Sequence, residues 1–96
     1  MSRGPEGRVK DAVRKILETT GAYWFMPYQA GMGRSGIPDV IACHKGKFLG
    51  IECKAGKGKT TALQDRELAA VAAAGGAALI INETNLQLLK DTLDNL

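Results

Sequence analysis

The chain has 96 residues, of which 45% are hydrophobic and 24% charged, with a net charge of +3, as is typical of a globular protein. This length predicts a single domain, residues 1–96, with a modest core that a metal ion or a partner chain could help to stabilise. No apolar run approaches the roughly 20 residues of a membrane span, and the N-terminus does not read as a signal peptide. We therefore expect an intracellular protein, in its own cytoplasm or that of a host cell, that is not secreted and binds no membrane.

The first predicted elements are a helix and an aromatic strand. A helix is expected over Pro5–Thr20, where apolar residues recur at helical spacing and Gly21 follows as a stop. The segment from Ala22 to Tyr28 is expected to form a strand. It carries four large apolar residues that either pack in the core or form a dimer interface: Tyr23, Trp24, Phe25 and Met26.

Two further strands are predicted to form a hairpin. A loop over Gly31–Gly36 leads to an apolar strand over Val40–Cys43, and a second strand runs from Lys47 to Ala55. His44-Lys45-Gly46-Lys47 between them is typical of a tight hairpin turn. A basic loop, Gly56-Lys57-Gly58-Lys59, follows the second strand.

The C-terminal third predicts a helix, a strand and a helix. Thr61 with Gln64 three residues later indicates a capping box at the start of a helix that ends near Ala74. A strand is expected over Ala77–Ile81 and a last helix over Thr84–Leu93, again from a Thr-x-x-Gln start. The order α-β-β-β-α-β-α predicts an α/β fold, a mixed central β-sheet flanked by helices on both faces.

The hairpin brings two carboxylates opposite each other. With Lys45-Gly46 as the tip, Asp39 pairs with Glu52, and directly opposed Cβ atoms lie about 4.5–5.5 Å apart. A four-residue loop gives the same pairing, whereas a three- or five-residue loop shifts it by one residue. Two acids so placed repel each other unless a cation lies between them, and Mg²⁺ commonly uses one or two carboxylates with a substrate phosphate.

Lys54 is expected beside this pair. Side chains alternate along a strand, so Leu49, Ile51 and Cys53 share a core face while Glu52 and Lys54 share the other. A lysine there can stabilise charge on a phosphate, or help to orient and deprotonate a water molecule held by the metal. An edge strand with an ordinary exposed Glu-x-Lys face is the structural alternative.

These residues carry a family resemblance. Gly36-Ile37-Pro38-Asp39, then twelve residues, then Glu52-Cys53-Lys54, resembles the signature of the PD-(D/E)XK nuclease superfamily, with its restriction-endonuclease-like fold. The surrounding pattern is similar to the VRR-NUC family, in Glu6, in Phe48-Leu49-Gly50-Ile51 before the motif and in Gln64 after it, and it covers the chain from Glu6 to about Ile81.

The resemblance implies a set of site residues and a reaction. Asp39 and Glu52 would ligate Mg²⁺ or Mn²⁺ with the backbone carbonyl of Cys53, Lys54 would be catalytic, and Gln64 would lie beside the site. The reaction implied is hydrolysis of phosphodiesters. Single-domain members of this kind resemble Holliday junction resolvases, which act as dimers.

Gln64 and Glu6 each have a structural alternative. Gln64 is also the capping-box partner of Thr61. Glu6 lies in a first helical turn, where an acid is favourable beside the helix dipole, and in the functional interpretation it approaches the metal directly or through water.

Cations in two loops are candidate DNA contacts. Arg34, Lys57 and Lys59 are expected on flexible basic surfaces that touch phosphates without reading sequence, although plain turns account for them too. The spacing Gly31-x-Gly33-x-x-Gly36 spells a dinucleotide loop, but Pro38 and a strand follow it instead of a helix. Gly58-Lys59-Thr60 lacks the earlier glycine of a phosphate loop.

Charge and cysteine placement add weaker signals. Residues 1–60 hold 11 Lys/Arg and 5 Asp/Glu, whereas residues 61–96 hold 2 and 5, so the basic part favours a polyanion partner or is a solubilising face. The first helix carries a basic stripe that either faces DNA or is a solvated surface, since Asp11 and Glu18 are interleaved with its members, Arg8, Lys10, Arg14 and Lys15. Cys43 and Cys53 are expected to be buried free thiols, and His44 a surface residue.

The sequence therefore predicts a Mg²⁺- or Mn²⁺-dependent, structure-selective DNA endonuclease, a homodimer that cuts branched DNA such as a four-way junction. A less selective nicking or flap nuclease is the alternative among enzymes. A nucleic-acid-binding module that never cuts, or a scaffold domain with solvent-facing carboxylates, is the alternative outside them.

Overall fold

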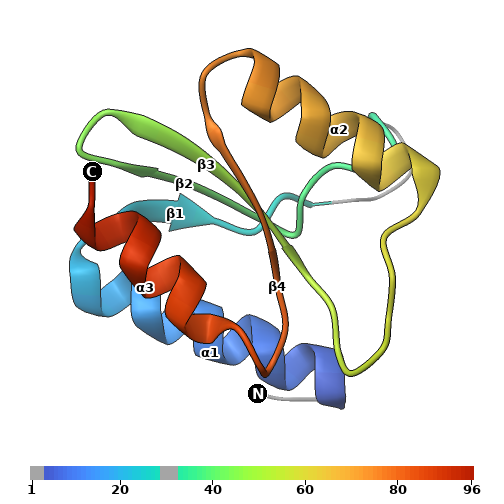
Figure 1. Ribbon diagram of the computed structural model, residues 1–96, viewed down its shortest axis with the longest axis horizontal. Coiled ribbons are helices and arrows are strands. Elements are labelled where there is room, and N and C mark those ends of the chain that lie inside the picture. The colour runs from blue at the N-terminus through green and yellow to red at the C-terminus, as the bar shows by residue number, and fades with distance from the viewer. Residues whose placement is uncertain (1–3, 29–32) are drawn as a thin grey trace.

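A computed structural model describes residues 4–28 and 33–96 (Figure 1). Its elements follow the predicted order α-β-β-β-α-β-α, so that order is confirmed. They are α1 (Pro5–Thr20), β1 (Tyr23–Phe25), β2 (Val40–His44), β3 (Lys47–Cys53), α2 (Ala62–Ala73), β4 (Ala77–Ile81) and α3 (Leu86–Asp94).

The four strands form one mixed sheet in the order β1-β2-β3-β4. β1, β2 and β3 are successively antiparallel, and β4 lies parallel to β3 after the crossover through α2. Parallel neighbours need such a crossover, since a tight turn can join only antiparallel strands. The mixed sheet predicted from the sequence is confirmed.

Helices cover both faces of this sheet, as Figure 1 shows. Between the sheet and the pair α1 and α3 lies the core, which includes Val13, Leu17, Leu49, Ile51, Cys53, Ile81 and Leu89. α2 lies on the opposite face, where Gly50 gives it room: a Cβ there would meet Val71 at 3.3 Å and Pro38 at 3.0 Å. The core face predicted for alternate residues of β3 is thereby confirmed.

The hairpin between β2 and β3 has the predicted two-residue tip. Lys45 and Gly46 both have positive φ, of 52° and 81°, as a type I′ turn requires. His44 pairs with Lys47 and Val40 with Ile51, which is the register inferred from the turn residues.

The aromatic segment differs from expectation. β1 covers only Tyr23–Phe25 rather than Ala22 to Tyr28. Of its four large apolar residues Trp24 packs against the core, while Tyr23, Phe25 and Met26 are 72%, 46% and 40% exposed. The reason is topological: β1 is an edge strand, and its alternate residues point to a sheet face that α2 does not reach.

Cys43 is also exposed, so the prediction of a buried thiol is wrong for this residue and right for Cys53. Cys43 lies opposite Tyr23 on β1 and Phe48 on β3, which places it on the same uncovered face. The sequence of β2 is apolar on both faces of the strand, so it did not show which face is covered. On the face that carries Cys43, no helix of the described part of the chain covers the sheet at this strand.

The last helix begins later than predicted, at Leu86 rather than Thr84. The hydroxyl and amide of Thr84 both donate to Asn82 Oδ1, and Asn85 Oδ1 accepts from the Asn82 amide. These local side-chain bonds stabilise a turn in place of a first helical turn. β3 likewise ends at Cys53, two residues before the predicted Ala55.

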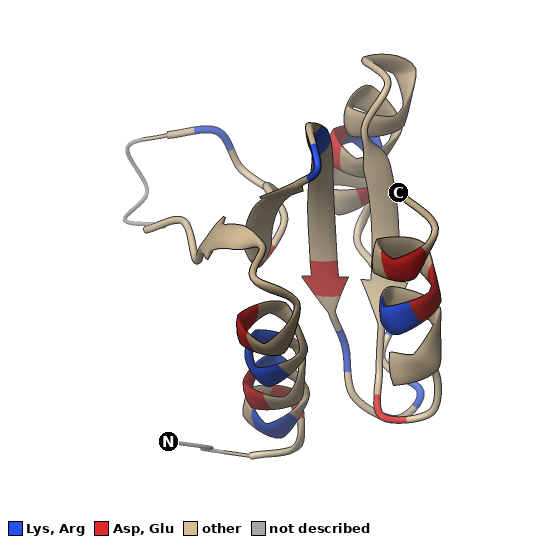
Figure 2. Ribbon diagram, turned by 90° about the vertical axis from the view of Figure 1, so that its left-hand side faces the viewer, with Lys and Arg blue, Asp and Glu red and all other residues tan. Residues whose placement is uncertain are grey.

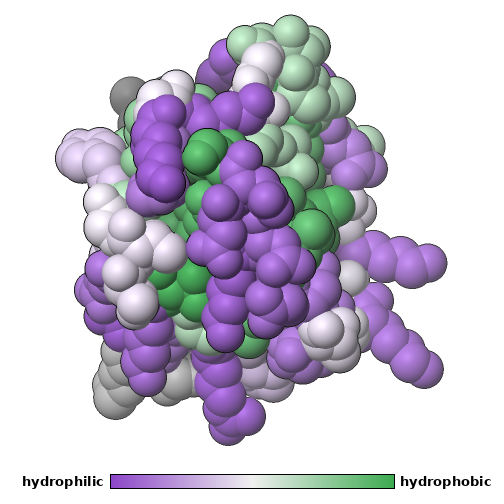
Figure 3. All heavy atoms as spheres, turned by 60° about the vertical axis from the view of Figure 1, so that its left-hand side comes forward, coloured by the Kyte–Doolittle hydropathy of each residue, from purple (hydrophilic) through white to green (hydrophobic). Residues whose placement is uncertain are grey.

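The surface is mixed in charge and polarity. Figure 2 shows basic and acidic positions alternating along α1, so its basic stripe is interrupted. Figure 3 shows hydrophobic atoms reaching the surface between hydrophilic groups. Within residues 4–28 and 33–96, no helix has the length and apolar character needed to cross a membrane.

Candidate active site

Asp39 and Glu52 meet where β2 begins and β3 ends. Asp39 immediately precedes β2, and the register that pairs Val40 with Ile51 sets it opposite Glu52. The backbone amide of Cys53 donates to Asp39 Oδ2 at 2.9 Å, which fixes this carboxylate against the end of β3. The predicted alignment of the two acids is therefore present.

Glu52 is buried with one oxygen bonded and the other bare. It is 1% exposed, its Oε2 accepts from Gln64 Nε2 at 2.9 Å, and the Lys54 ammonium lies 3.7 Å from the same oxygen. Oε1 is buried and has no hydrogen-bond partner among the described residues. A buried carboxylate oxygen without a partner is costly, so its position needs an explanation.

Burial raises the pKa of Glu52 to about 7, and the negative charge of the neighbouring Asp39 adds to the shift. Lys54 acts in the opposite direction by favouring the ionised form. Burial also raises the pKa of the Cys53 thiol to about 12. That thiol is fully buried and stays protonated, so it is not a metal ligand. The atom of Cys53 that could ligate a cation is its backbone carbonyl oxygen.

Gln64 fills both roles that the sequence left open. Its Oε1 accepts from the Thr61 amide, and its own amide donates to the Thr61 hydroxyl, which completes the predicted capping box. Its Nε2 is then directed to Glu52. One side chain thus caps α2 and orients the carboxylate.

The residues at this point fit a divalent cation. Two opposed carboxylates repel unless a cation lies between them. Glu52 Oε1 is buried without a hydrogen-bond partner among the described residues, so it is available as a ligand for such a cation. Within the described residues no three His, Cys, Asp or Glu side chains form a metal-binding group. A divalent cation held here would have the two carboxylates and the backbone carbonyl of Cys53 as its protein ligands, a set of oxygen ligands that suits such ions.

Glu6 does not join the two carboxylates directly. It lies in the first turn of α1 and pairs with Lys10, whose ammonium is 3.8 Å from Glu6 Oε2 and 3.8 Å from Asp39 Oδ1. The sequence predicted Lys10 in a basic stripe of this helix, either DNA-facing or solvated, and not beside Asp39. The spacing of four residues from Glu6 is the signal that could have paired them on one helix face.

Arg34 pairs with α2 rather than standing free. Its guanidinium donates to Glu67 Oε2 at 2.8 Å, and Glu67 is 6% exposed. No sequence pattern indicates this contact, because the partners are 33 residues apart. Gly31, the first glycine of the supposed dinucleotide spacing, lies outside the described residues.

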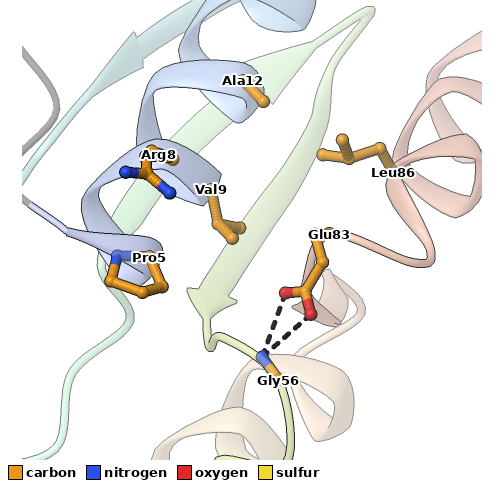
Figure 4. Close-up of a pocket in the computed structure, with 7 residues that line it drawn as sticks. All are labelled: Pro5, Arg8, Val9, Ala12, Gly56, Glu83 and Leu86. Atoms are coloured by element: carbon orange, nitrogen blue, oxygen red, sulfur yellow. Dashed lines mark hydrogen bonds between the residues drawn. The ribbon is translucent and has the colours of Figure 1, made fainter.

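Lys57 and Lys59 are exposed in the loop after β3. The loop is held at its base by Glu83, whose two carboxylate oxygens each accept from the Gly56 amide at 3.0 Å (Figure 4). This bond lowers the pKa of Glu83. A cleft of about 370 Å³ opens beside it, between the start of α1 and the start of α3.

Comparisons with known proteins identify the family of this chain. Residues 10–86 match the model of the archaeal Holliday junction resolvase family, Hjc. The chain belongs to this family. A solved structure described as a VRR_NUC domain superposes with a TM-score of 0.69 at 23% identity, over 83% of this chain and 86% of that chain.

The superposition confirms the restriction-endonuclease-like fold, and membership of the Hjc family makes the chain a nuclease that hydrolyses phosphodiester bonds. No curated protein matches the sequence. The resemblance to the VRR-NUC family seen in the sequence motif thus extends to the fold.

Proposed function

We propose that this Hjc-family nuclease is a Mg²⁺- or Mn²⁺-dependent endonuclease that cuts four-way DNA junctions as a homodimer inside the cell. The observation that carries the metal dependence is the opposed pair Asp39 and Glu52, with the bare buried oxygen Glu52 Oε1. Family membership supports the junction substrate.

The chain's own residues have separable roles in this proposal. The Cys53 amide bonds Asp39 Oδ2 and the Gln64 side-chain amide bonds Glu52 Oε2, so each carboxylate is held in place through one of its oxygens. Lys54, kept beside Glu52, stabilises the negative charge that builds up on the scissile phosphate. A bound divalent cation would lower the pKa of the attacking water and neutralise phosphate charge.

Exposed cations near the site would hold the DNA backbone. Lys57 and Lys59 follow the catalytic strand within a few residues, and the bond between Glu83 and Gly56 limits how far the base of their loop can move. Arg34 is 70% exposed even though it is paired with Glu67, so one side of its guanidinium remains accessible. Such contacts position DNA without reading its sequence.

A cleavage assay tests the enzyme. Four-way junction, flap and linear duplex DNA are incubated at equal salt with Mn²⁺, Mg²⁺ or EDTA. We expect metal-dependent cutting of the junction in preference to the others, and a loss of at least about a hundredfold in Asp39→Ala with junction binding retained. Asp94→Ala, which removes an exposed acid on α3, is the matched control.

Equal cutting of flap or duplex DNA would contradict junction selectivity and favour the nicking nuclease. Junction binding that EDTA leaves unchanged, with no cutting in either metal, would contradict the enzyme and favour a binding module.

The dimer is proposed to form through the uncovered sheet face beside β1. Tyr23, Phe25, Phe48 and Cys43 share this face, and the rings of Tyr23 and Phe25 meet edge to face at 6.3 Å. Exposed aromatics grouped in this way are typical of protein interfaces. A two-fold dimer would present two active sites at a fixed separation, which suits the two opposed cuts that a four-way junction needs.

Sedimentation of Phe25→Arg tests this interface. We expect the parent to sediment as a dimer and the variant as a folded monomer, because a charge in an apolar interface loses its hydration. Leu88→Arg is the control, since Leu88 is 45% exposed on α3. A parent that is monomeric, or a Phe25→Arg protein that remains dimeric, would contradict the proposed interface.

A further inference from the structure

Lys10 contacts the carboxylate that the proposed function assigns to the metal. It reaches from α1 to Asp39 at the end of the sheet, and its ammonium lies 3.8 Å from Asp39 Oδ1. The Lys10 side chain is 36% exposed and that of Asp39 is 13% exposed, so the pair is partly shielded from water. It is therefore a stronger interaction than an ion pair on an open surface.

The site holds acids and ammoniums in alternation. Lys10 lies between Glu6 and Asp39, and Lys54 lies beside Glu52. Without these ammoniums the neighbouring carboxylates would repel each other, as any like charges at short range do. In the metal-free protein Lys10 thus supplies part of the positive charge that the pair Asp39 and Glu52 requires.

Lys10 and a divalent cation compete for Asp39. Both are positive, and two cations that approach the same carboxylate also repel each other. If Asp39 ligated such a cation, the ammonium of Lys10 would be displaced from this carboxylate. Its flexible four-carbon stem and its partial exposure allow the ammonium to move towards solvent, where it could meet a phosphate.

We propose that Lys10 is a second active-site lysine: it is the internal counter-ion of Asp39 in the metal-free protein and is released to a DNA phosphate when the metal binds. The proposal rests on the proposed function, because it takes Asp39 as a metal ligand. It differs from the role of Lys54, which stays next to the buried Glu52.

Mn²⁺ binding to the full chain without DNA tests the competition. Calorimetry compares the parent with Lys10→Met, which keeps the apolar stem, and with Lys15→Met, which removes an exposed charge from the same helix away from the site. We expect Lys10→Met to bind Mn²⁺ about three- to tenfold more tightly and Lys15→Met to match the parent. Lys10→Gln gives the same comparison if the Met variant does not fold.

Lys10→Arg separates charge from packing, because it keeps the charge and is expected to bind Mn²⁺ as the parent does. Unchanged or weaker binding in Lys10→Met, or an equal gain in Lys10→Arg, would overturn the proposal.

Junction binding in Ca²⁺ tests the release to phosphate. If Lys10 contacts one phosphate, the slope of log affinity against log salt should be smaller by about 0.9 in Lys10→Met than in the parent. An unchanged slope would overturn this part. A parent that binds Mn²⁺ but cuts no DNA would instead overturn the proposed function and leave the competition for Asp39 standing.

Discussion

At the scale of single residues, the site depends on a few side chains that each serve two purposes. Gln64 caps α2 and bonds Glu52, and Lys10 links α1 to Asp39. Glu52 is the residue of the site that destabilises the fold, since it is buried and its Oε1 has no hydrogen-bond partner among the described residues. A site of this kind stores free energy that would be recovered when a cation binds, so it should be a weak point of the metal-free fold.

The raised pKa of Glu52 predicts how the stability of the metal-free protein depends on pH. Because the folded pKa is about 7 and the ordinary value is 4.5, the folded state binds the proton more tightly, and stability falls as pH rises from about 4.5 through 7. Glu52→Gln cannot ionise. In EDTA at pH 8 it should be more stable than the parent by on the order of 2 kcal/mol, with the difference vanishing below about pH 4.

Urea unfolding at each pH measures this difference, and Glu18→Gln, an exposed acid on α1, is the control. A Glu52→Gln protein whose stability follows the parent at every pH would show that Glu52 is not strained by burial.

Thr61→Ala and Gln64→Ala separate the two purposes of Gln64. Each removes the capping box, so each should cost about 1 kcal/mol in the free energy of unfolding. Only Gln64→Ala frees Glu52, so only this variant should weaken Mn²⁺ binding, by about tenfold, and slow cleavage. Calorimetry with Mn²⁺ decides the point, and an equal loss of affinity in Thr61→Ala would mean that Gln64 acts through the helix alone.

At the scale of elements, the site is held where the loop before β2 crosses the start of α2. Gly36 has φ of 80°, and a Cβ there would lie 2.6 Å from the backbone carbon of Leu63 and 2.9 Å from the amide nitrogen of Gln64. Only glycine permits this approach. The bond from Arg34 to the buried Glu67 fastens the same loop to α2.

Gly36→Ala should therefore be strongly destabilising, by about 2–4 kcal/mol, because the clash is with backbone and the left-handed conformation adds strain. Gly33→Ala is the matched control in the same loop, since nothing lies within 4 Å of its Cβ position. Thermal unfolding compares the two. A Gly36→Ala protein as stable as Gly33→Ala would mean that the loop does not rest on α2.

At the scale of the whole molecule, the sheet face that α2 covers is covered unequally: α2 packs on β3 and β4, and β1 and β2 have no helix of the described residues over them on this face. α2 spans β3 and β4 but leaves the aromatic face of β1 and β2 open, and the exposed Lys57 and Lys59 follow the other end of β3. The proposed dimer contact and the proposed DNA contact are thus separated along the sheet. Partner and substrate could bind at the same time.

Salt dependence reports on the proposed DNA surface as a whole. A substitution of both Lys57 and Lys59 by Gln should reduce the slope of log affinity against log salt by about 1.8, because each lysine that meets a phosphate contributes about 0.9. Fluorescence anisotropy with a labelled junction measures the slope. Replacing Lys45 and Lys47 at the hairpin tip removes the same charge elsewhere, and an equal effect there would mean that net charge alone attracts the DNA.

Much of the fold follows from local patterns. Apolar spacing predicted α1, the turn residues Lys45-Gly46 predicted the register of β2 and β3, and that register brought Asp39 opposite Glu52. These signals are local because a hairpin fixes pairing through its own turn. The start of α3 was predicted wrongly, since Asn82 Oδ1 accepts from the Thr84 amide and Asn85 Oδ1 from the Asn82 amide, and these bonds hold a turn there.

What the sequence determined by itself is therefore the order of elements and the carboxylate pair with its lysine, because the turn and the alternation along β3 are set by neighbouring residues. Only the tertiary structure decided that Gln64 reaches Glu52, that Lys10 reaches Asp39, and that Tyr23, Phe25 and Cys43 stay uncovered. These outcomes depend on where helices lie against the sheet. That placement arises from packing between segments far apart in the chain, which no local spacing encodes.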